Sequence, residues 1–142
     1  MPRNLEGRLS SGWPVALAVF RVMFGLLFLS HGLSKVIGWP ADHAAPVGQW
    51  PDYYAGLIEL VTGVLITAGL FTRAAAFVAS GEMAFAYFTV HLPHHLSPIR
   101  DAFPINNHGE AAVMYCFAFL LLVFAGGGAY AMDDRRRGRL RR

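Results

Sequence analysis

The feature that most constrains the fold is a hydrophobic stretch at residues 15–38 that also carries three basic side chains. This stretch reads VALAVFRVMFGLLFLSHGLSKVIG and contains Arg21, His31 and Lys35. A helix of ~20 apolar residues crosses the hydrocarbon core of a bilayer, so the stretch is long enough to span one. A charge near the bilayer centre costs at least ~2.5–3.5 kcal/mol on insertion scales, and such side chains face the interior of a bundle. The sequence therefore predicts further helices that supply acidic partners.

The composition is that of an integral membrane protein. Of the 142 residues, 55% are hydrophobic and 15% are charged, whereas soluble domains carry ~25% charged residues. The single cysteine, Cys116, excludes an internal disulfide, a CxxC redox pair and a zinc-finger site. Within a hydrophobic segment it is interpreted as a small buried apolar residue.

Three more hydrophobic segments follow the first. The sequence predicts helices at 15–38, 53–70, 74–90 and 110–130, in a single domain that covers residues 1–142. Residues 71–73 are too few for anything but a tight turn, so the second and third helices are expected to be antiparallel neighbours. The predicted fold class is all-α, an integral membrane four-helix bundle.

Arginine placement predicts the orientation of this bundle. Arg3, Arg8, Arg73 and the six arginines of residues 135–142 fall on one side of a four-span topology, and Arg100 falls on the other. Cytoplasmic loops are enriched in arginine and lysine, so both termini are expected to be cytoplasmic. The basic tail at 133–142 is expected to face the lipid surface and is not interpreted as a nucleic-acid site.

Depth along the helices predicts one buried ion pair. Arg21 lies six residues into its segment, about 9 Å deep, and Glu82 lies nine residues beyond Arg73, about 13 Å deep from the same side. A guanidinium group spans that offset, so Arg21 and Glu82 are predicted to form a structural ion pair. Whether the pair only fixes helix register or also has a function is left open.

The outer ends of the segments predict a polar pocket. His31 lies one helical turn before Lys35, Glu59 lies near the level of His31, and Glu110 opens the last segment. These four residues are expected to converge and are the candidate catalytic residues. His31, Lys35 and Glu59 are the candidate cofactor contacts, and a purely structural role for the cluster is the alternative.

A second group of histidines follows the third segment. His91, His94 and His95 form HxxHH, which suggests metal or haem ligation. Because no carboxylate or cysteine completes a recognised metal spacing, no metal site is predicted and haem is disfavoured. The three side chains are interpreted as interfacial and solvated.

Four runs of residues resemble the DoxX family of small bacterial four-helix membrane proteins over about residues 15–133. They read RVMFGLLFLSHGLSKVIGW, ELVTGVLITAGLFTRAAA, MAFAYFTVH and NNHGEAAVMYCFAFLLL. The HGxxK motif, the E-x3-G…GLFTR junction and an N-x-GE-like opening of the last segment occur together and in order. His108 stands where family members often have Gly or Asn. The positions that match the family are Arg21, His31, Lys35, Glu59, Glu82 and Glu110.

The resemblance implies a multi-pass protein of the bacterial inner membrane with a role in redox chemistry. The family takes its name from relatives of a membrane subunit of thiosulfate:quinone oxidoreductase, and other members are linked to oxidative or thiol stress. A quinone-interacting or accessory subunit of an oxidoreductase is the favoured function, with a quinone as the expected cofactor, while enzymatic activity is left open. His31 or Lys35 would bind a quinone carbonyl and Glu59 or Glu110 would exchange its proton. The alternatives are a scaffold that recruits soluble oxidoreductases and a small-molecule transporter, with a homo-oligomer also considered.

Overall fold

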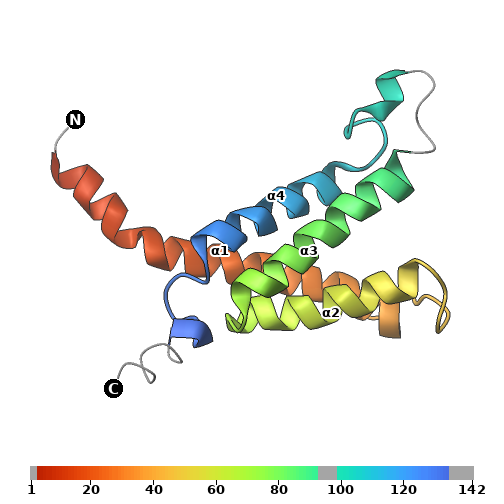
Figure 1. Ribbon diagram of the computed structural model, residues 1–142, viewed down its shortest axis with the longest axis horizontal. Coiled ribbons are helices and arrows are strands. Elements are labelled where there is room, and N and C mark those ends of the chain that lie inside the picture. The colour runs from red at the N-terminus through yellow and green to blue at the C-terminus, as the bar shows by residue number, and fades with distance from the viewer. Residues whose placement is uncertain (1–2, 93–98, 135–142) are drawn as a thin grey trace.

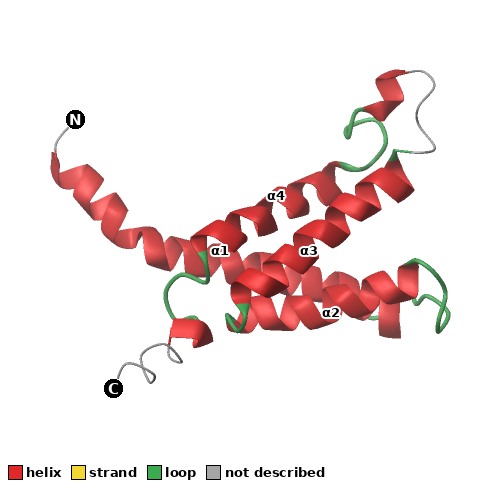
Figure 2. Cartoon of the chain, in the orientation of Figure 1, coloured by secondary structure: helices red, strands yellow, loops and turns green. Residues whose placement is uncertain are grey.

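Four long helices form two hairpins that cross each other (Figure 1). The computed structural model describes residues 3–92 and 99–134. The helices are α1 (Arg3–Ile37), α2 (Asp52–Ala68), α3 (Thr72–Ala86) and α4 (Glu110–Ala125). α1 packs along α2, α3 packs along α4, and α2 also contacts α3. The described residues contain no strand (Figure 2), which confirms the predicted all-α four-helix fold.

Two helix ends differ from the predicted ends. α1 begins at Arg3, so the expected polar lead is helical, and its first turns project away from the bundle (Figure 1). Pro14 lies inside α1, and its carbonyl oxygen accepts a hydrogen bond of 2.9 Å from the Ala129 amide. α4 ends at Ala125, before residue 130, because Gly126 and Gly128 adopt φ values of 84° and 70° that a helix cannot continue through.

The predicted tight turn joins α2 to α3, and the end of the described chain closes it. Gly69 ends α2 in the left-handed conformation, with φ of 70°. The carboxylate of Asp133 accepts hydrogen bonds from the amides of Phe71, at 2.8 Å, and Thr72, at 2.9 Å. Because the first amides of a helix have no partner within it, Asp133 acts as a cap for α3.

Small residues set the contact between α1 and α2. An added Cβ on Gly32 would lie 2.8 Å from Leu60 Cα, and one on Gly63 would lie 2.7 Å from the Leu29 nitrogen. Such close approach of backbones through glycine is typical of helix pairs in membranes. Phe28, Ile66 and Phe119 fill the space between the two hairpins and are fully buried.

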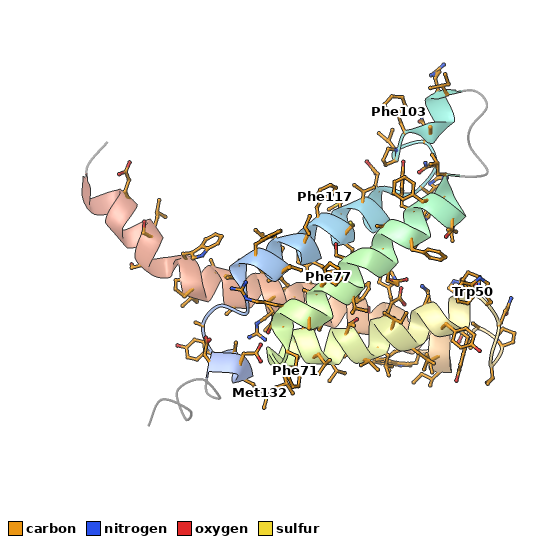
Figure 3. All side chains as sticks on the ribbon, in the orientation of Figure 1. Trp50, Phe71, Phe77, Phe103, Phe117 and Met132 are labelled. Atoms are coloured by element: carbon orange, nitrogen blue, oxygen red, sulfur yellow. The ribbon has the colours of Figure 1, made fainter. Side chains whose placement is uncertain are left out.

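Large apolar side chains cover the outside of the bundle. Phe77 on α3 and Phe117 on α4 point away from the neighbouring helices (Figure 3), and both are exposed. The outward-facing apolar residues also include Val19, Met23, Val61, Val64, Phe88, Leu121 and Phe124. An outer surface this apolar is suited to lipid and would be a liability in water.

One described helix, Leu9–Ile37, is long and apolar enough by itself to cross a membrane, and α4 is a shorter apolar helix. α2 has 17 residues, and the 15 residues of α3 continue into the π-helical turn η1, Tyr87–His91. The short 3₁₀ helix η2, Ile99–Ala102, lies in the connection to α4. At ~1.5 Å per residue, α2 and α4 are ~24–26 Å long, slightly less than a typical hydrocarbon core.

Candidate functional site

Arg21 does not pair with Glu82, contrary to the sequence-based prediction. Its side chain is 3% exposed, and its guanidinium group donates to three backbone carbonyls. Nε donates to Gly127 O at 2.8 Å, and Nη1 donates to Ile66 O at 2.9 Å and Thr67 O at 2.7 Å. Within residues 3–92 and 99–134, Arg21 and Glu82 form no ion pair.

The reason lies in the position of Arg21 along the bundle. The last carbonyls of a helix have no partner within it and carry partial negative charge, which favours a cation there. Arg21 lies beside the end of α2, whereas Glu82 lies most of the way along α3. The depth estimate counted Arg21 from residue 15, whereas the structure places its guanidinium group at the end of α2, beside Ile66 and Thr67. Arg73 binds the end of α4 in the same way: its Nη1 donates a hydrogen bond of 3.0 Å to Val123 O.

A cavity of about 340 Å³ lies between the two hairpins, towards the end that holds the α1–α2 loop. All four helices contribute to its wall. Its polar side chains include His31 and Lys35 from α1, Glu59 from α2, Glu82 from α3, His91 from η1 and Tyr115 from α4. The volume is in the range of small-molecule sites. Three of the four residues predicted for the outer pocket therefore share one cavity.

Lys35 and Glu59 form the ion pair at the centre of this cavity. Lys35 Nζ and Glu59 Oε1 are 2.7 Å apart, and the two side chains are 30% and 2% exposed. Glu59 Oε2 is buried and has no hydrogen-bond partner within residues 3–92 and 99–134. A buried ion pair with an unfilled acceptor gives up part of its stabilisation, so such a pair is weak as a purely structural element.

Glu82 also lines the cavity, a position that the sequence analysis did not predict. Its Oε2 atom is buried without a hydrogen-bond partner among the described residues, and the side chain shares the cavity wall with Glu59 and Lys35. A signal was present in the sequence. Glu59 lies eleven residues before Leu70 and Glu82 lies eleven after Phe71, which sets them at one depth on antiparallel neighbours.

Glu110 does not join the other predicted pocket residues. It is exposed at the first position of α4 and is absent from the cavity wall, although Ala111 and Ala112 belong to it. Two features explain this. Successive residues of a helix point ~100° apart, and the crossing of the hairpins moves the start of α4 away from α1 and α2 (Figure 1).

Several aromatic rings also contribute to the wall. The Tyr115 ring lies edge-on to His31, with centroids 5.8 Å apart, and also contacts Phe28 at 5.5 Å. Trp50, which Figure 3 labels beside the start of α2, approaches Phe85 of α3 with centroids 6.2 Å apart. The cavity thus has an apolar body and a polar end, the arrangement that binds flat amphipathic molecules.

The C-terminal end of α3 is distorted next to this cavity. The Leu92 amide donates to Tyr87 O at 2.9 Å, one residue further back than in an α-helix, and such π-helical turns are frequent at functional sites. The turn brings His91 into the cavity wall, with Nδ1 3.2 Å from Asn107 O. His94 and His95 lie outside the described residues, and no group of metal-binding side chains is found among those described.

The loop before α4 shows why the N-x-GE-like motif has its residues. The Asn107 side chain is buried, and its Oδ1 accepts a hydrogen bond of 2.9 Å from the Gly109 amide. His108 adopts φ of 59°, the left-handed conformation, which explains why Gly or Asn suits that position. An added Cβ on Gly109 would lie 2.7 Å from a Tyr87 ring carbon, so this glycine is required by close packing.

An apolar outer surface, close glycine contacts and a polar cavity between four helices define an α-helical membrane protein. Comparison with known proteins agrees, because the DoxX family pattern matches residues 16–92, and the chain belongs to that family. An uncharacterized protein of Haemophilus influenzae is 40% identical over 125 residues, 86% of this chain and 91% of the relative. The inner membrane protein YphA of Escherichia coli is 29% identical over 133 residues, with the same shares covered. No solved structure matches the chain.

Proposed function

We propose that this chain is a quinone-interacting subunit of an oxidoreductase system in the bacterial inner membrane. The observation that carries the proposal is the cavity between the hairpins, which combines aromatic walls with the buried Lys35–Glu59 ion pair. Cavities of this kind within a bundle hold flat apolar molecules whose polar groups meet a few fixed side chains.

The polar side chains can support the chemistry that interconverts a quinone and its quinol. Reduction of a quinone takes up two electrons and two protons. Lys35, His31 or Tyr115 can donate hydrogen bonds to quinone oxygens, and the carboxyl groups of Glu59 and Glu82 can exchange the protons. The electrons come from, or return to, a partner oxidoreductase, since the single cysteine excludes an internal dithiol.

The proposed setting is a four-span topology with both termini cytoplasmic. The lengths of α1, α2, α3 with η1, and α4 support it, as does the placement of the first turns of α1 and the last described residues on the same side in Figure 1. Arg73 lies at that end, in agreement with positive charge on the cytoplasmic side. The name of the YphA relative supports the inner membrane as the location.

The test is an analysis of what the protein carries when it is purified in native lipid. We expect a UV–visible spectrum and mass spectrometry of an organic extract to show a bound quinone in the unaltered protein. The quinone should be lost from His31→Ala and Glu59→Gln and retained by Glu110→Gln, which removes a carboxylate outside the cavity. An empty preparation that instead co-purifies with soluble oxidoreductases would contradict the proposal and favour the scaffold function.

A further inference from the structure

Two carboxyl groups in the cavity present hydrogen-bond acceptors that the protein leaves unused. Glu59 is 2% exposed, and while its Oε1 binds Lys35, its Oε2 has no hydrogen-bond partner among the described residues. Glu82 Oε2 is likewise buried and finds no partner in that part of the chain. Leaving a buried acceptor unpaired costs free energy. A hydrogen-bond donor is therefore favoured next to these two oxygens.

The charges of the cavity point in the same direction. Glu59 and Glu82 line the same cavity, and Lys35 forms an ion pair with Glu59. Two carboxylates that face one space repel each other unless a proton, a cation or a donor stands between them. The last torsion of a glutamate is broad and roughly two-fold, so either oxygen of Glu82 can turn towards the cavity.

The wall restricts what kind of donor fits. The wall that contains the carboxyl groups also presents aromatic and apolar surface, from Phe28, Trp50, Tyr54, Met83 and Phe85. A flat ring that carries hydroxyl groups matches both the surface and the acceptors, because the ring packs on the aromatic side chains while each hydroxyl group donates to a carboxylate.

We propose that the cavity binds the reduced, dihydroxy form of its aromatic ligand in preference to the quinone, through hydrogen bonds donated to Glu59 and Glu82. This inference rests on the proposed function and adds the redox form that the site selects. A quinone has only acceptor oxygens, which can accept from Lys35, His31 or Tyr115 but leave the oxygens of Glu59 and Glu82 unpaired. A quinol also has two hydroxyl donors, each of which can pair with a carboxylate oxygen.

The test compares three ligands on the full chain in lipid nanodiscs. The probes are an alkyl-substituted benzoquinol kept reduced under argon, the matching benzoquinone, and the dimethyl ether of the same quinol. The ether keeps the ring and the tail but cannot donate a hydrogen bond. Isothermal titration calorimetry should show the quinol binding at least ~10-fold more tightly than either of the others, as expected for a charge-assisted hydrogen bond.

Variants assign this preference to the carboxylates. Glu82→Gln, which breaks no ion pair, should reduce the preference for the quinol to less than about 3-fold, and Glu59→Gln should do the same. Glu110→Gln should leave it unchanged. Circular dichroism confirms that each variant keeps its helices, so a loss of binding is not a loss of fold.

The outcomes separate the two proposals. Equal binding of the quinol and its ether, or tighter binding of the quinone, would overturn the inference while the proposed function stands. If neither redox form binds, both proposals fall. Retention of the full preference by Glu82→Gln together with Glu59→Gln would also overturn the inference, because the carboxylates would then not be its source.

Discussion

At the scale of single residues, Arg21 joins three parts of the chain through one guanidinium group. Its donors reach the end of α2, at Ile66 and Thr67, and the segment after α4, at Gly127. Arginine suits this position because its donors are spread over a rigid plane, whereas lysine offers one compact ammonium group. The residue therefore acts on the ends of helices and not on the cavity.

We predict that Arg21→Lys destabilises the bundle by about 2–3 kcal/mol, because at least one charge-assisted hydrogen bond to a buried carbonyl is lost. The measurement is unfolding in mixed micelles, followed by the helical signal in circular dichroism. A double-mutant cycle with Glu82→Gln should give a coupling energy below about 0.5 kcal/mol, as for independent sites. A larger coupling energy would restore the ion pair that the sequence suggested.

The types of the site residues could be read from the sequence, but their grouping could be read only in part. Buried charge is expensive in a membrane, so His31, Lys35, Glu59 and Glu82 stood out wherever their partners lay. Depth arithmetic placed Glu59 near the level of His31 and grouped both with Lys35, and these three residues do line one cavity. It failed for Glu82 and Glu110, because depth fixes the height of a side chain and not the direction in which it points.

At the scale of elements, the α1–α2 hairpin depends on contacts that only glycine allows. The backbones approach so closely that a methyl group on Gly32 would meet the backbone of Leu60. In lipid, helices gain little from the hydrophobic effect and associate through such close packing. Gly81, in the middle of α3, faces open space, since an added Cβ would have no atom within 4 Å.

We predict opposite effects for alanine at these two glycines. Gly32→Ala should destabilise the bundle by about 1–3 kcal/mol, because the added carbon forces the helices apart. Gly81→Ala should be neutral or should stabilise by up to about 1 kcal/mol, because alanine is the better helix former. Unfolding in mixed micelles compares the two variants directly. Equal effects would mean that close packing of α1 on α2 does not limit stability.

Sequence periodicity located the helices but not all of their ends. The hydrophobic pattern stops at the start of residues 15–38, and Pro14 is a typical helix boundary. α1 nevertheless continues back to Arg3, and the carbonyl of Pro14 accepts a hydrogen bond from the amide of Ala129, in the segment after α4. That contact joins residues far apart in the chain, and no local pattern encodes it.

At the scale of the whole molecule, the crossing of the two hairpins creates the cavity. Short turns fix which helices are antiparallel neighbours, and this much followed from the three residues between the second and third segments. The angle between one hairpin and the other depends on side-chain packing over the entire interface, around Phe28, Ile66 and Phe119. That angle opens the outer end of the bundle and moves Glu110 away from the site (Figure 1).

The same arrangement predicts which loops lie on each side of the membrane. The α1–α2 loop and the α2–α3 turn lie at opposite ends of α2, so cysteines placed in them must react from opposite sides. Suitable positions are His43 in the loop and Ala74 beside the turn, both exposed. In a Cys116→Ala background, we predict that His43→Cys reacts with a membrane-impermeant maleimide in right-side-out vesicles. Ala74→Cys should react only after the vesicles are opened.

This expectation follows from the distribution of arginine. Arg73 follows the α2–α3 turn, and insertion keeps such basic residues in the cytoplasm. The Cys116→Ala protein, which has no cysteine, controls for unspecific labelling. Each variant should be present in cells at an unaltered level, which controls for folding. Reversed labelling would place both termini outside and would move the cavity, which opens near the α1–α2 loop, to the cytoplasmic half of the bilayer. A quinol bound there would exchange its protons with the cytoplasm, so the labelling pattern also decides the side on which those protons are taken up or released.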